Sequence, residues 1–300
     1  MDLTIGPNPF FWPAETVRGF YRDMAASPAT RVVLGELVCS KRLPFWEGEI
    51  PAAIEALTAA GKEVALTTLA LITLKRERKL TGDLIDMGLP VEVNDLSALH
   101  LIPPGTPFWV GPLVNVYNEG TLAFLARRGA TRVCLPPELP LASVATLAAR
   151  GRDLGVAVEV WGHGRLPLAV SGRCYHARLH DRAKDSCQFV CGDDPDGRDV
   201  DTLDGQPFLA VNGIQTLSQS TASMAHHVSA LAEAGVAALR LSPQSRDFAA
   251  VVAGYRALLD GATEAESLVD MLRASVPQGR LSNGYPTGPS GAAFDRRPIG

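Results

Sequence analysis

Cysteine is the residue type in this chain whose spacing points most directly to chemistry. Three of the five cysteines fall within eighteen residues, as Cys174-x12-Cys187-x3-Cys191, and a fourth, Cys39, ends an apolar run far upstream. Four thiolates are the number that holds a zinc ion or an iron–sulfur cluster. Four unrelated structural cysteines are the alternative, which such close spacing in a five-cysteine chain disfavours. The sequence therefore predicts a four-cysteine metal site.

The kind of metal follows less directly from the pattern. Structural zinc sites usually contain two short Cys-x2–4-Cys pairs, whereas this chain has one such pair. Iron–sulfur is therefore slightly favoured, and zinc stays open at this point. Positive charge close to the cysteines would offset the negative charge of four thiolates. The basic residues that lie near them in the sequence are Lys41, Arg42, Arg173, Arg178, Arg182 and Lys184.

The other candidate groups carry weaker signals. Cys134 lies inside a strand-like run and is predicted to be a buried, inert thiol. His163 and His176 are candidate ligands or acid–base groups, although a single histidine is more often an ordinary hydrogen-bonded residue. The chain contains no H-E-x-x-H, G-x-S-x-G or glycine-rich nucleotide-binding motif. The polar residues that would suit a small-molecule pocket at strand ends are Glu36, Asn94, Asp95, Asn115, Asn118, Asn212, Gln215 and Gln244.

A fold must position these residues, and the chain alternates strand-like apolar runs with amphipathic helical stretches. The eight expected strands are Leu3–Ile5, Arg31–Leu37, Glu63–Leu69, Val91–Asn94, Phe108–Gly111, Arg132–Leu135, Val156–Trp161 and Ala238–Leu241. The helices expected between them are Ala14–Ala26, Ile50–Ala60, Lys79–Met87, Gly120–Arg128 and Leu141–Leu154. This rhythm is typical of parallel strands joined by crossover helices. It predicts an α/β fold, a (β/α)8 TIM-like barrel, with a doubly wound open sheet as the alternative.

The rhythm breaks once, after the seventh expected strand. We predict a β-rich insertion over about residues 162–217, which carries three of the cysteines, followed by a helix over Ser218–Ala234. The whole of residues 1–276 is expected to form a single barrel domain, and residues 277–300 a Gly/Pro-rich C-terminal extension. Functional groups of such barrels gather beyond the C-terminal ends of the strands. Cys39 and Cys174 both follow strand-like runs, so we expect them to face the same rim.

Composition narrows the classes of partner and compartment. The chain has 28 basic and 32 acidic residues, and this balance gives no electrostatic reason to expect nucleic acid as a partner. No apolar run reaches the roughly 18 residues that a membrane span needs. The N-terminus lacks the layout of a secretory signal, and five unevenly spaced cysteines disfavour a disulfide framework. The expected compartment is a reducing cytoplasm.

Several segments resemble the collagenase-like peptidase family, and in particular its iron–sulfur branch, which serves oxygen-independent ubiquinone synthesis. The segments are GELVCSKR (35–42), ALTTLALIT (65–73), VEVNDLSAL (91–99), GRLPLAVSGRCYHARLHDRAKDSC (164–187), NGIQTLS (212–218) and RLSPQ (240–244). The likeness runs from the first expected strand to about Tyr285. One departure is the sequence Ser282-Asn283-Gly284-Tyr285-Pro286, where the family often has Cys-Asn-Gly-Tyr/Phe-Trp.

The resemblance implies a TIM-like barrel that binds a [4Fe–4S] cluster through Cys39, Cys174, Cys187 and Cys191. It also implies a heterodimer with a UbiU-like sister protein that carries its own cluster, and help from a UbiT-like lipid-carrier protein. The implied reaction hydroxylates a hydrophobic aromatic quinone precursor without oxygen, with prephenate as the oxygen donor. Two alternatives stay open: a collagenase-like peptidase or zinc hydrolase, and a non-catalytic scaffold subunit that its cluster stabilises.

Overall fold

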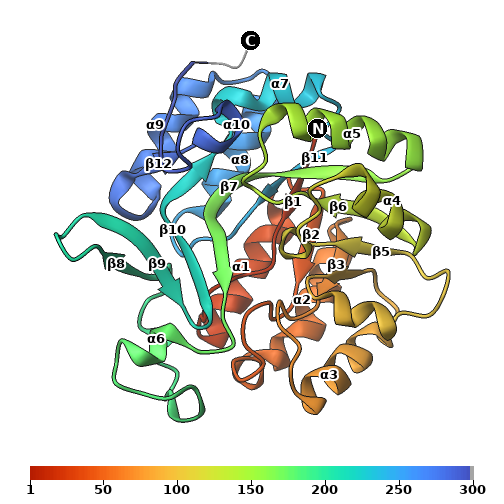
Figure 1. Ribbon diagram of the computed structural model, residues 1–300, viewed down its shortest axis with the longest axis vertical. Coiled ribbons are helices and arrows are strands. Elements are labelled where there is room, and N and C mark those ends of the chain that lie inside the picture. Colours follow the sequence, from red (N-terminus) through yellow and green to blue (C-terminus); the bar gives the residue numbers. More distant parts are fainter. Residues whose placement is uncertain (298–300) are drawn as a thin grey trace.

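Eight parallel strands close into a barrel in the computed structural model, which describes residues 1–297 (Figure 1). In order around the barrel they are β1 (Asp2–Ile5), β2 (Arg31–Leu34), β3 (Glu63–Thr67), β4 (Val91–Val93), β5 (Phe108–Val110), β6 (Ala130–Cys134), β7 (Ala157–Val170) and β11 (Ala238–Leu241). Each strand pairs in parallel with the next, and β11 pairs with both β7 and β1 to close the ring. This closed ring confirms the predicted (β/α)8 barrel and excludes the open sheet.

Helices cover the outside of the barrel between successive strands (Figure 1). The longer ones are α1 (Ala14–Ala26), α2 (Ile50–Ala59), α3 (Lys75–Ile85), α4 (Glu119–Arg127), α5 (Leu141–Leu154), α7 (Val228–Glu233), α8 (Phe248–Leu259) and α9 (Ala265–Ser275). Helix α3 begins four residues before the expected start, because the Glu77 carboxylate accepts the N–H groups of Thr73 and Leu74 and caps its first turn. Between β4 and β5 the connection is a short 3-10 helix, η3 (Leu96–His100).

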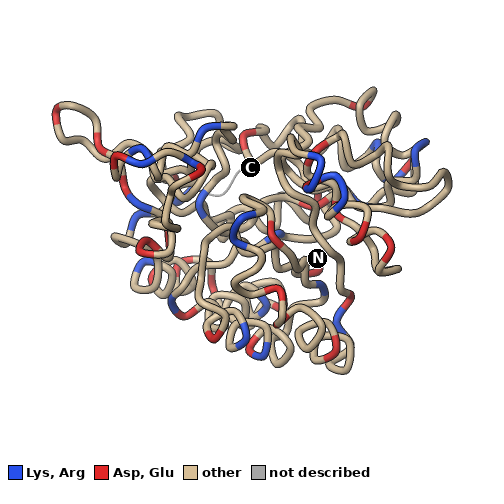
Figure 2. Tube along the Cα trace, turned by 90° about the horizontal axis from the view of Figure 1, so that it is seen from below, with Lys and Arg blue, Asp and Glu red and all other residues tan. Residues whose placement is uncertain are grey.

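The other short helices lie in loops. They are η1 (Leu43–Phe45), η2 (Glu47–Glu49), η4 (Pro112–Val114), α6 (Tyr175–Arg178), η5 (Lys184–Ser186), η6 (Val190–Gly192), η7 (Ala225–His227), η8 (Pro277–Gly279) and α10 (Gly284–Thr287). Within residues 1–297, none of the helices combines the length and the apolar character needed to cross a membrane. Lysine and arginine are interspersed with aspartate and glutamate along the trace (Figure 2). Neither sign of charge dominates the fold.

Strand β7 is longer than predicted, because it continues from the seventh expected strand into the predicted β-rich insertion. Its 14 residues, Ala157–Val170, include all of Val156–Trp161 except the first residue. Beyond the barrel, β7 pairs antiparallel with β10 (Gln215–Ser223), which continues to β9 (Pro207–Asn212) and β8 (Arg198–Asp201). These strands form a β-rich extension, and β8 and β9 project from the body (Figure 1).

The predicted helix over Ser218–Ala234 is wrong in its first half. Residues up to Ser223 belong to β10, and only Val228–Glu233 are α-helical, as α7. The protruding part of β7 presents a row of unpaired backbone groups, and pairing with β10 satisfies them. Local sequence pattern contains no information about that edge.

The predicted C-terminal extension contains short elements that pack on the barrel. Strand β12 (Leu281–Ser282) pairs with β10, and the Asn283 side chain donates to the Asp295 carbonyl. Residues 282–286, whose sequence departs from the family pattern, are therefore the place where the C-terminal segment packs against the barrel. Residues 298–300 of the extension lie outside the described part.

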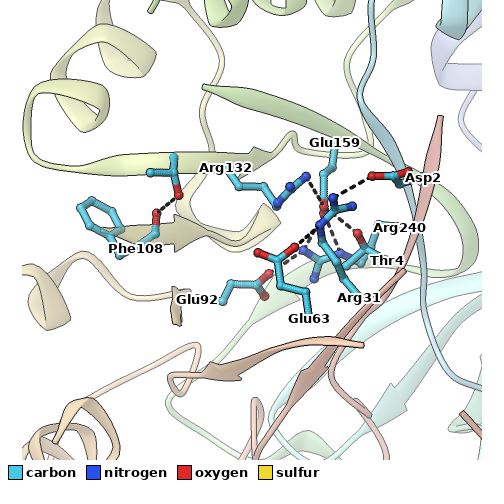
Figure 3. A network of polar contacts seen from close by, with 10 residues as sticks. Asp2, Thr4, Arg31, Glu63, Glu92, Phe108, Arg132, Glu159 and Arg240 are labelled. Carbon is cyan, nitrogen blue, oxygen red and sulfur yellow. Dashed lines mark hydrogen bonds and ion pairs between the residues drawn. The ribbon is translucent and has the colours of Figure 1, made fainter. Parts of the chain in front are cut away.

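A network of buried charges spans the inside of the barrel (Figure 3). Arg240 on β11 donates to Glu92 on β4 at 2.5 Å and to Glu159 on β7 at 2.8 Å. Glu159 also accepts from Thr4 and Arg132. Burying charge costs free energy unless every charged group is paired and hydrogen-bonded. The shared guanidinium meets that condition and ties opposite sides of the barrel together.

Candidate metal centre

Cys39 is held by a turn that the carboxylate of Glu36 organises. Strand β2 ends at Leu34, three residues before the predicted end, because Gly35 turns the chain with a φ of 130°. The Glu36 carboxylate then accepts the N–H groups of Val38 at 2.8 Å and Cys39 at 3.0 Å. Burial raises the pKa of Glu36 despite these bonds and the nearby Arg42. The turn places Cys39 beyond the C-terminal end of β2, on the expected rim.

Cys174 begins α6, just after the long β7 strand. Its sulfur accepts the N–H of Ala177 at 3.4 Å, which caps the helix, and its S–H donates to the carbonyl of Gly213 at 3.2 Å. Gly213 lies in the turn between β9 and β10. The cysteine is thereby fixed against the β-rich extension.

Cys187 and Cys191 are brought together by a tight loop. Cys187 follows η5, and Cys191 lies within η6. Between them, Gln188 and Phe189 both adopt left-handed backbone conformations, with φ of 50° and 56°. Residues with a side chain adopt this region at a free-energy cost, which surrounding contacts must offset. Phe189 packs against Phe45 and so stabilises the loop.

All four cysteines line one narrow cavity. None of them is in a disulfide. The other residues around the cavity are Lys41, Arg42, His176, Lys184, Phe189, Val190, Gly213 and Ile214. The loops that follow β2 and β7 therefore converge, as we expected from the strand ends. Of the six basic residues expected near the cysteines, Lys41, Arg42 and Lys184 line the cavity and the three other arginines do not.

Arg42 is the dominant charge at this cavity, and it is only 1% exposed. Its guanidinium donates to Asn212 at 2.5 Å and to the Pro9 carbonyl at 3.3 Å, and it also contacts Cys191. Burial nevertheless raises the pKa of the Cys191 thiol, and also that of Cys39, although Arg42 opposes both shifts. Metal binding would replace the thiol protons with a cation that the buried sulfurs can share.

The distances between the four cysteine sulfurs indicate which kind of metal centre they could hold. Four thiolates around one zinc ion lie about 3.8 Å apart, given Zn–S bonds of about 2.3 Å in a tetrahedron. In residues 1–297, no three of the four sulfurs lie within 4.8 Å of one another. A cluster separates its ligands further, because different iron atoms bind the different thiolates. The four thiols and their spacing are compatible with an iron–sulfur cluster.

A profile of peptidase family U32 matches residues 20–293. The chain belongs to peptidase family U32. The match extends over most of the barrel and the cysteine-bearing extension, and it confirms the family to which the sequence segments pointed.

Solved structures similar to this U32 protein are distant from it. Tryptophan synthase from Mycobacterium tuberculosis is 16% identical, with 61% of this chain and 80% of that chain covered and a TM-score of 0.36. N-isopropylammelide isopropylaminohydrolase from Burkholderia multivorans is 12% identical, with coverage of 92% and 64% and a TM-score of 0.42.

In the U32 protein, Cys134 and His163 lie away from the cysteine cavity. Cys134 is fully buried, as predicted, and burial raises the pKa of its thiol. His163 is fully buried and bonded to Gln244 at 2.9 Å, and burial lowers its pKa to about 4. His226 contacts Glu266, and His227 contacts Asn283. These hydrogen bonds give both histidines structural roles.

The polar residues that we expected at strand ends do not form one pocket, and they lie at several places in the fold. Asn94 and Gln215 line a narrow cavity at the mouth of the barrel, with Trp161, Arg165 and Arg240. Others have local roles: Asp95 and Asn118 accept backbone N–H groups that begin helices, and Asn212 contacts Arg42. Glu36 orders the Cys39 turn, Gln244 contacts His163, and Asn115 lines a separate surface pocket.

Two residues that the sequence reasoning did not single out lie beside the cysteines. His180 and Asp194 gather with His176 into a small group whose ligand atoms lie within 4.8 Å of one another. The spacing His176-x3-His180 was the available signal, since it puts two imidazoles on one face of a helical turn. Asp194 had no comparable signal, because only the fold brings it there.

Proposed function

We propose that this U32 protein acts as the iron–sulfur subunit of an oxygen-independent hydroxylation system in ubiquinone synthesis, the role of UbiV. The observation that supports it is the single cavity lined by Cys39, Cys174, Cys187 and Cys191. The barrel suits either activity, and the four convergent thiols favour a metal centre over the peptidase activity that the family name describes. A reducing, cytoplasmic setting would keep these thiols available.

The cysteines would hold a [4Fe–4S] cluster, and the flanking residues would control its surroundings. Such a cluster supplies one-electron redox chemistry at a potential that hydrogen bonds and burial adjust. Arg42, Lys41 and Lys184 would offset the charge of four thiolates. Apolar groups on the cavity wall, Val190 and Ile214, would limit access of water.

The mouth of the barrel is the place we propose for the organic reactant. Its cavity is lined by the buried Arg165, whose Nε has no hydrogen-bond partner within residues 1–297, and by the indole of Trp161. Arginine suits the carboxylates of a prephenate-like oxygen donor, and an indole suits an aromatic ring. The two cavities are neighbours, because Arg42 and Gln215 donate to the same carbonyl, that of Pro9.

Exposed apolar side chains near the cysteines support a protein partner such as a UbiU-like subunit. Tyr175 and Leu179, in and after α6, are 51% and 48% exposed, and Phe45 on η1 is 50% exposed. All three belong to segments that also shape the cysteine cavity. A partner docked there would lie close to the cluster, as electron or substrate exchange with a sister subunit requires. A UbiT-like carrier would bring the quinone precursor to that complex.

Anaerobic purification tests the metal centre directly. We expect a coloured protein with about four irons per chain, together with inorganic sulfide and a cluster absorption band. Cys187→Ala should lose this iron, whereas Cys134→Ser should keep it, because Cys134 lies inside β6 away from the cavity. A colourless protein, or a Cys187→Ala variant with unchanged iron, would overturn the proposal.

The same preparation separates the alternatives. A colourless protein with one zinc and peptide-cleaving activity would indicate a zinc hydrolase or collagenase-like peptidase. A variant with a redox-inert metal that still supports quinone hydroxylation in anaerobic cells would indicate a scaffold subunit. Co-purification with a UbiU-like protein, and loss of ubiquinone in anaerobic cells that lack this chain, are the results that the proposal itself predicts.

A further inference from the structure

His176, His180 and Asp194 form a compact cluster of metal-ligating groups separate from the cysteine sulfurs. Their ligand atoms lie within 4.8 Å of one another. The two imidazole rings are stacked, with centroids 5.6 Å apart and planes that differ by 4°. His176 is fully buried, and His180 and Asp194 are half-buried. The cluster therefore has a buried base and an edge open to solvent.

Hydrogen bonding determines the tautomer of His176. Its Nδ1 lies 3.3 Å from the carbonyl oxygen of Val211. A carbonyl can only accept, so Nδ1 carries the hydrogen and Nε2 of the neutral ring presents a lone pair. That Nε2 lies 3.1 Å from a carboxylate oxygen of Asp194. Two acceptors thus face each other at close range.

Three atoms of this cluster lack hydrogen-bond partners within residues 1–297. They are Nε2 of His176, Nε2 of His180 and Oδ2 of Asp194. A buried polar atom without a partner is costly, and most such atoms in native proteins have an ion, a water or a protein group. A cation placed among the three would satisfy all of them together.

We propose that His176, His180 and Asp194 bind one divalent zinc ion, distinct from the metal at the four cysteines. Two imidazole nitrogens and a carboxylate oxygen form a common zinc ligand set. Ligands around tetrahedral zinc lie about 3.3 Å apart, given bonds of about 2.0–2.1 Å, and the His176–Asp194 separation of 3.1 Å is close to that. The bond from His176 to Val211 is the second-shell support that ligating histidines usually have.

The ion would fasten the loop that carries two of the cysteines. Asp194 follows Cys191 by three residues, and His176 follows Cys174 by two. Helix α6 has four residues and is too short to be stable by itself. A zinc ion that joins α6 to the segment after η6 would close the loop around Cys187. This role holds whatever the cysteines themselves bind.

The test uses the full chain, purified without oxygen, dialysed against a chelator and then given one equivalent of zinc chloride. We expect one zinc per chain after gel filtration. X-ray absorption at the zinc edge should show nitrogen and oxygen neighbours at about 2.0–2.1 Å and no sulfur at about 2.3 Å. Zinc should also slow tryptic cleavage after Arg182, which lies in the fastened loop.

Variants separate this site from other histidines and from the cysteines. His180→Ala and Asp194→Asn should each weaken zinc binding at least about tenfold, with a circular dichroism spectrum that matches the unaltered chain. His226→Gln is the control, because His226 also faces a carboxylate, that of Glu266, but lies far along the chain. It should bind zinc as the unaltered chain does.

Several outcomes would refute the site. They are zinc that is not retained, zinc with sulfur neighbours, or equal binding by His180→Ala and the unaltered chain. The first would mean that His176 is protonated and simply pairs with Asp194. Iron is measured in the same preparation before dialysis, so absence of iron with zinc retained afterwards would refute only the iron–sulfur proposal. Iron retained without zinc would refute only this one.

Discussion

Replacing Arg240 with methionine should destabilise the barrel more than any exposed charge replacement. Arg240 is 1% exposed, and Glu92 and Glu159 are fully buried. Its guanidinium donates to Glu159 through Nε and Nη2, at 3.2 and 2.8 Å, and to Glu92 through Nη2 at 2.5 Å. Methionine keeps much of the length of the side chain and removes all three bonds. The result is two buried carboxylates without their shared cation.

The magnitude depends on what each carboxylate retains. Glu159 keeps the Arg132 guanidinium at 3.1 Å. Among the described residues, Glu92 keeps only the amide of Asn94 at 3.1 Å, which carries no charge. Removing one partner of a buried ion pair costs about 3–5 kcal/mol, because the other charge stays buried and uncompensated. We therefore expect R240M to lower the free energy of unfolding by that amount, mostly through Glu92.

Urea unfolding followed by circular dichroism at neutral pH measures this loss. Lys79→Met is the matched control, because its exposed pair with Asp83 should contribute less than about 1 kcal/mol. Adding E92Q to R240M should restore at least about half of the loss, since it neutralises the stranded carboxylate. If R240M unfolds within about 1 kcal/mol of the unaltered chain, or if E92Q restores nothing, the account of the network is wrong.

Two further predictions concern Glu36 and the response to acid. Glu36→Ala removes the acceptor for the N–H groups of Val38 and Cys39 and so loosens the Cys39 turn. Alkylation of Cys39 in metal-free protein, measured by mass spectrometry, should therefore accelerate about tenfold. The control variant Glu47→Ala should leave the alkylation rate unchanged. Burial alone would raise the pKa of Glu159, but Arg240 and Arg132 outweigh it and hold the pKa below its ordinary value of about 4.5. The ionised Glu159 carboxylate therefore stabilises the fold above that pH, and this contribution is lost as the pH falls through the lowered pKa. Urea unfolding midpoints measured from about pH 6 to pH 3 should fall less steeply in E159Q than in the unaltered chain.

Much of the fold could be predicted from the local spacing of apolar residues, and both exceptions arise from strand pairing. The spacing of apolar residues predicted each barrel strand and most of the helices, because a strand or helix must bury a periodic face. The pattern failed at Ser218–Ser223, which pairs as a strand with the overhanging end of β7. It also failed to show that β7 continues unbroken past Trp161. Both depend on which backbone edge lies nearby, and that is a tertiary property.

Some residues of the candidate site could be predicted from the sequence, and others could not. Residue type and spacing alone predicted Cys39, Cys174, Cys187 and Cys191 as a set, and strand ends predicted their common rim. His180 was detectable from its spacing to His176, whereas Asp194 was not.

The sequence by itself determined the number of thiols, their chemical softness and the β/α rhythm of the barrel. The tertiary structure alone decided that Arg42 lies buried against Cys191, that Arg240 is shared between Glu92 and Glu159, and that Asp194 faces His176. The physical reason is distance along the chain. Contacts within a few residues follow from backbone periodicity, but contacts across 18 to 170 residues exist only after strand pairing and loop turns bring the segments together.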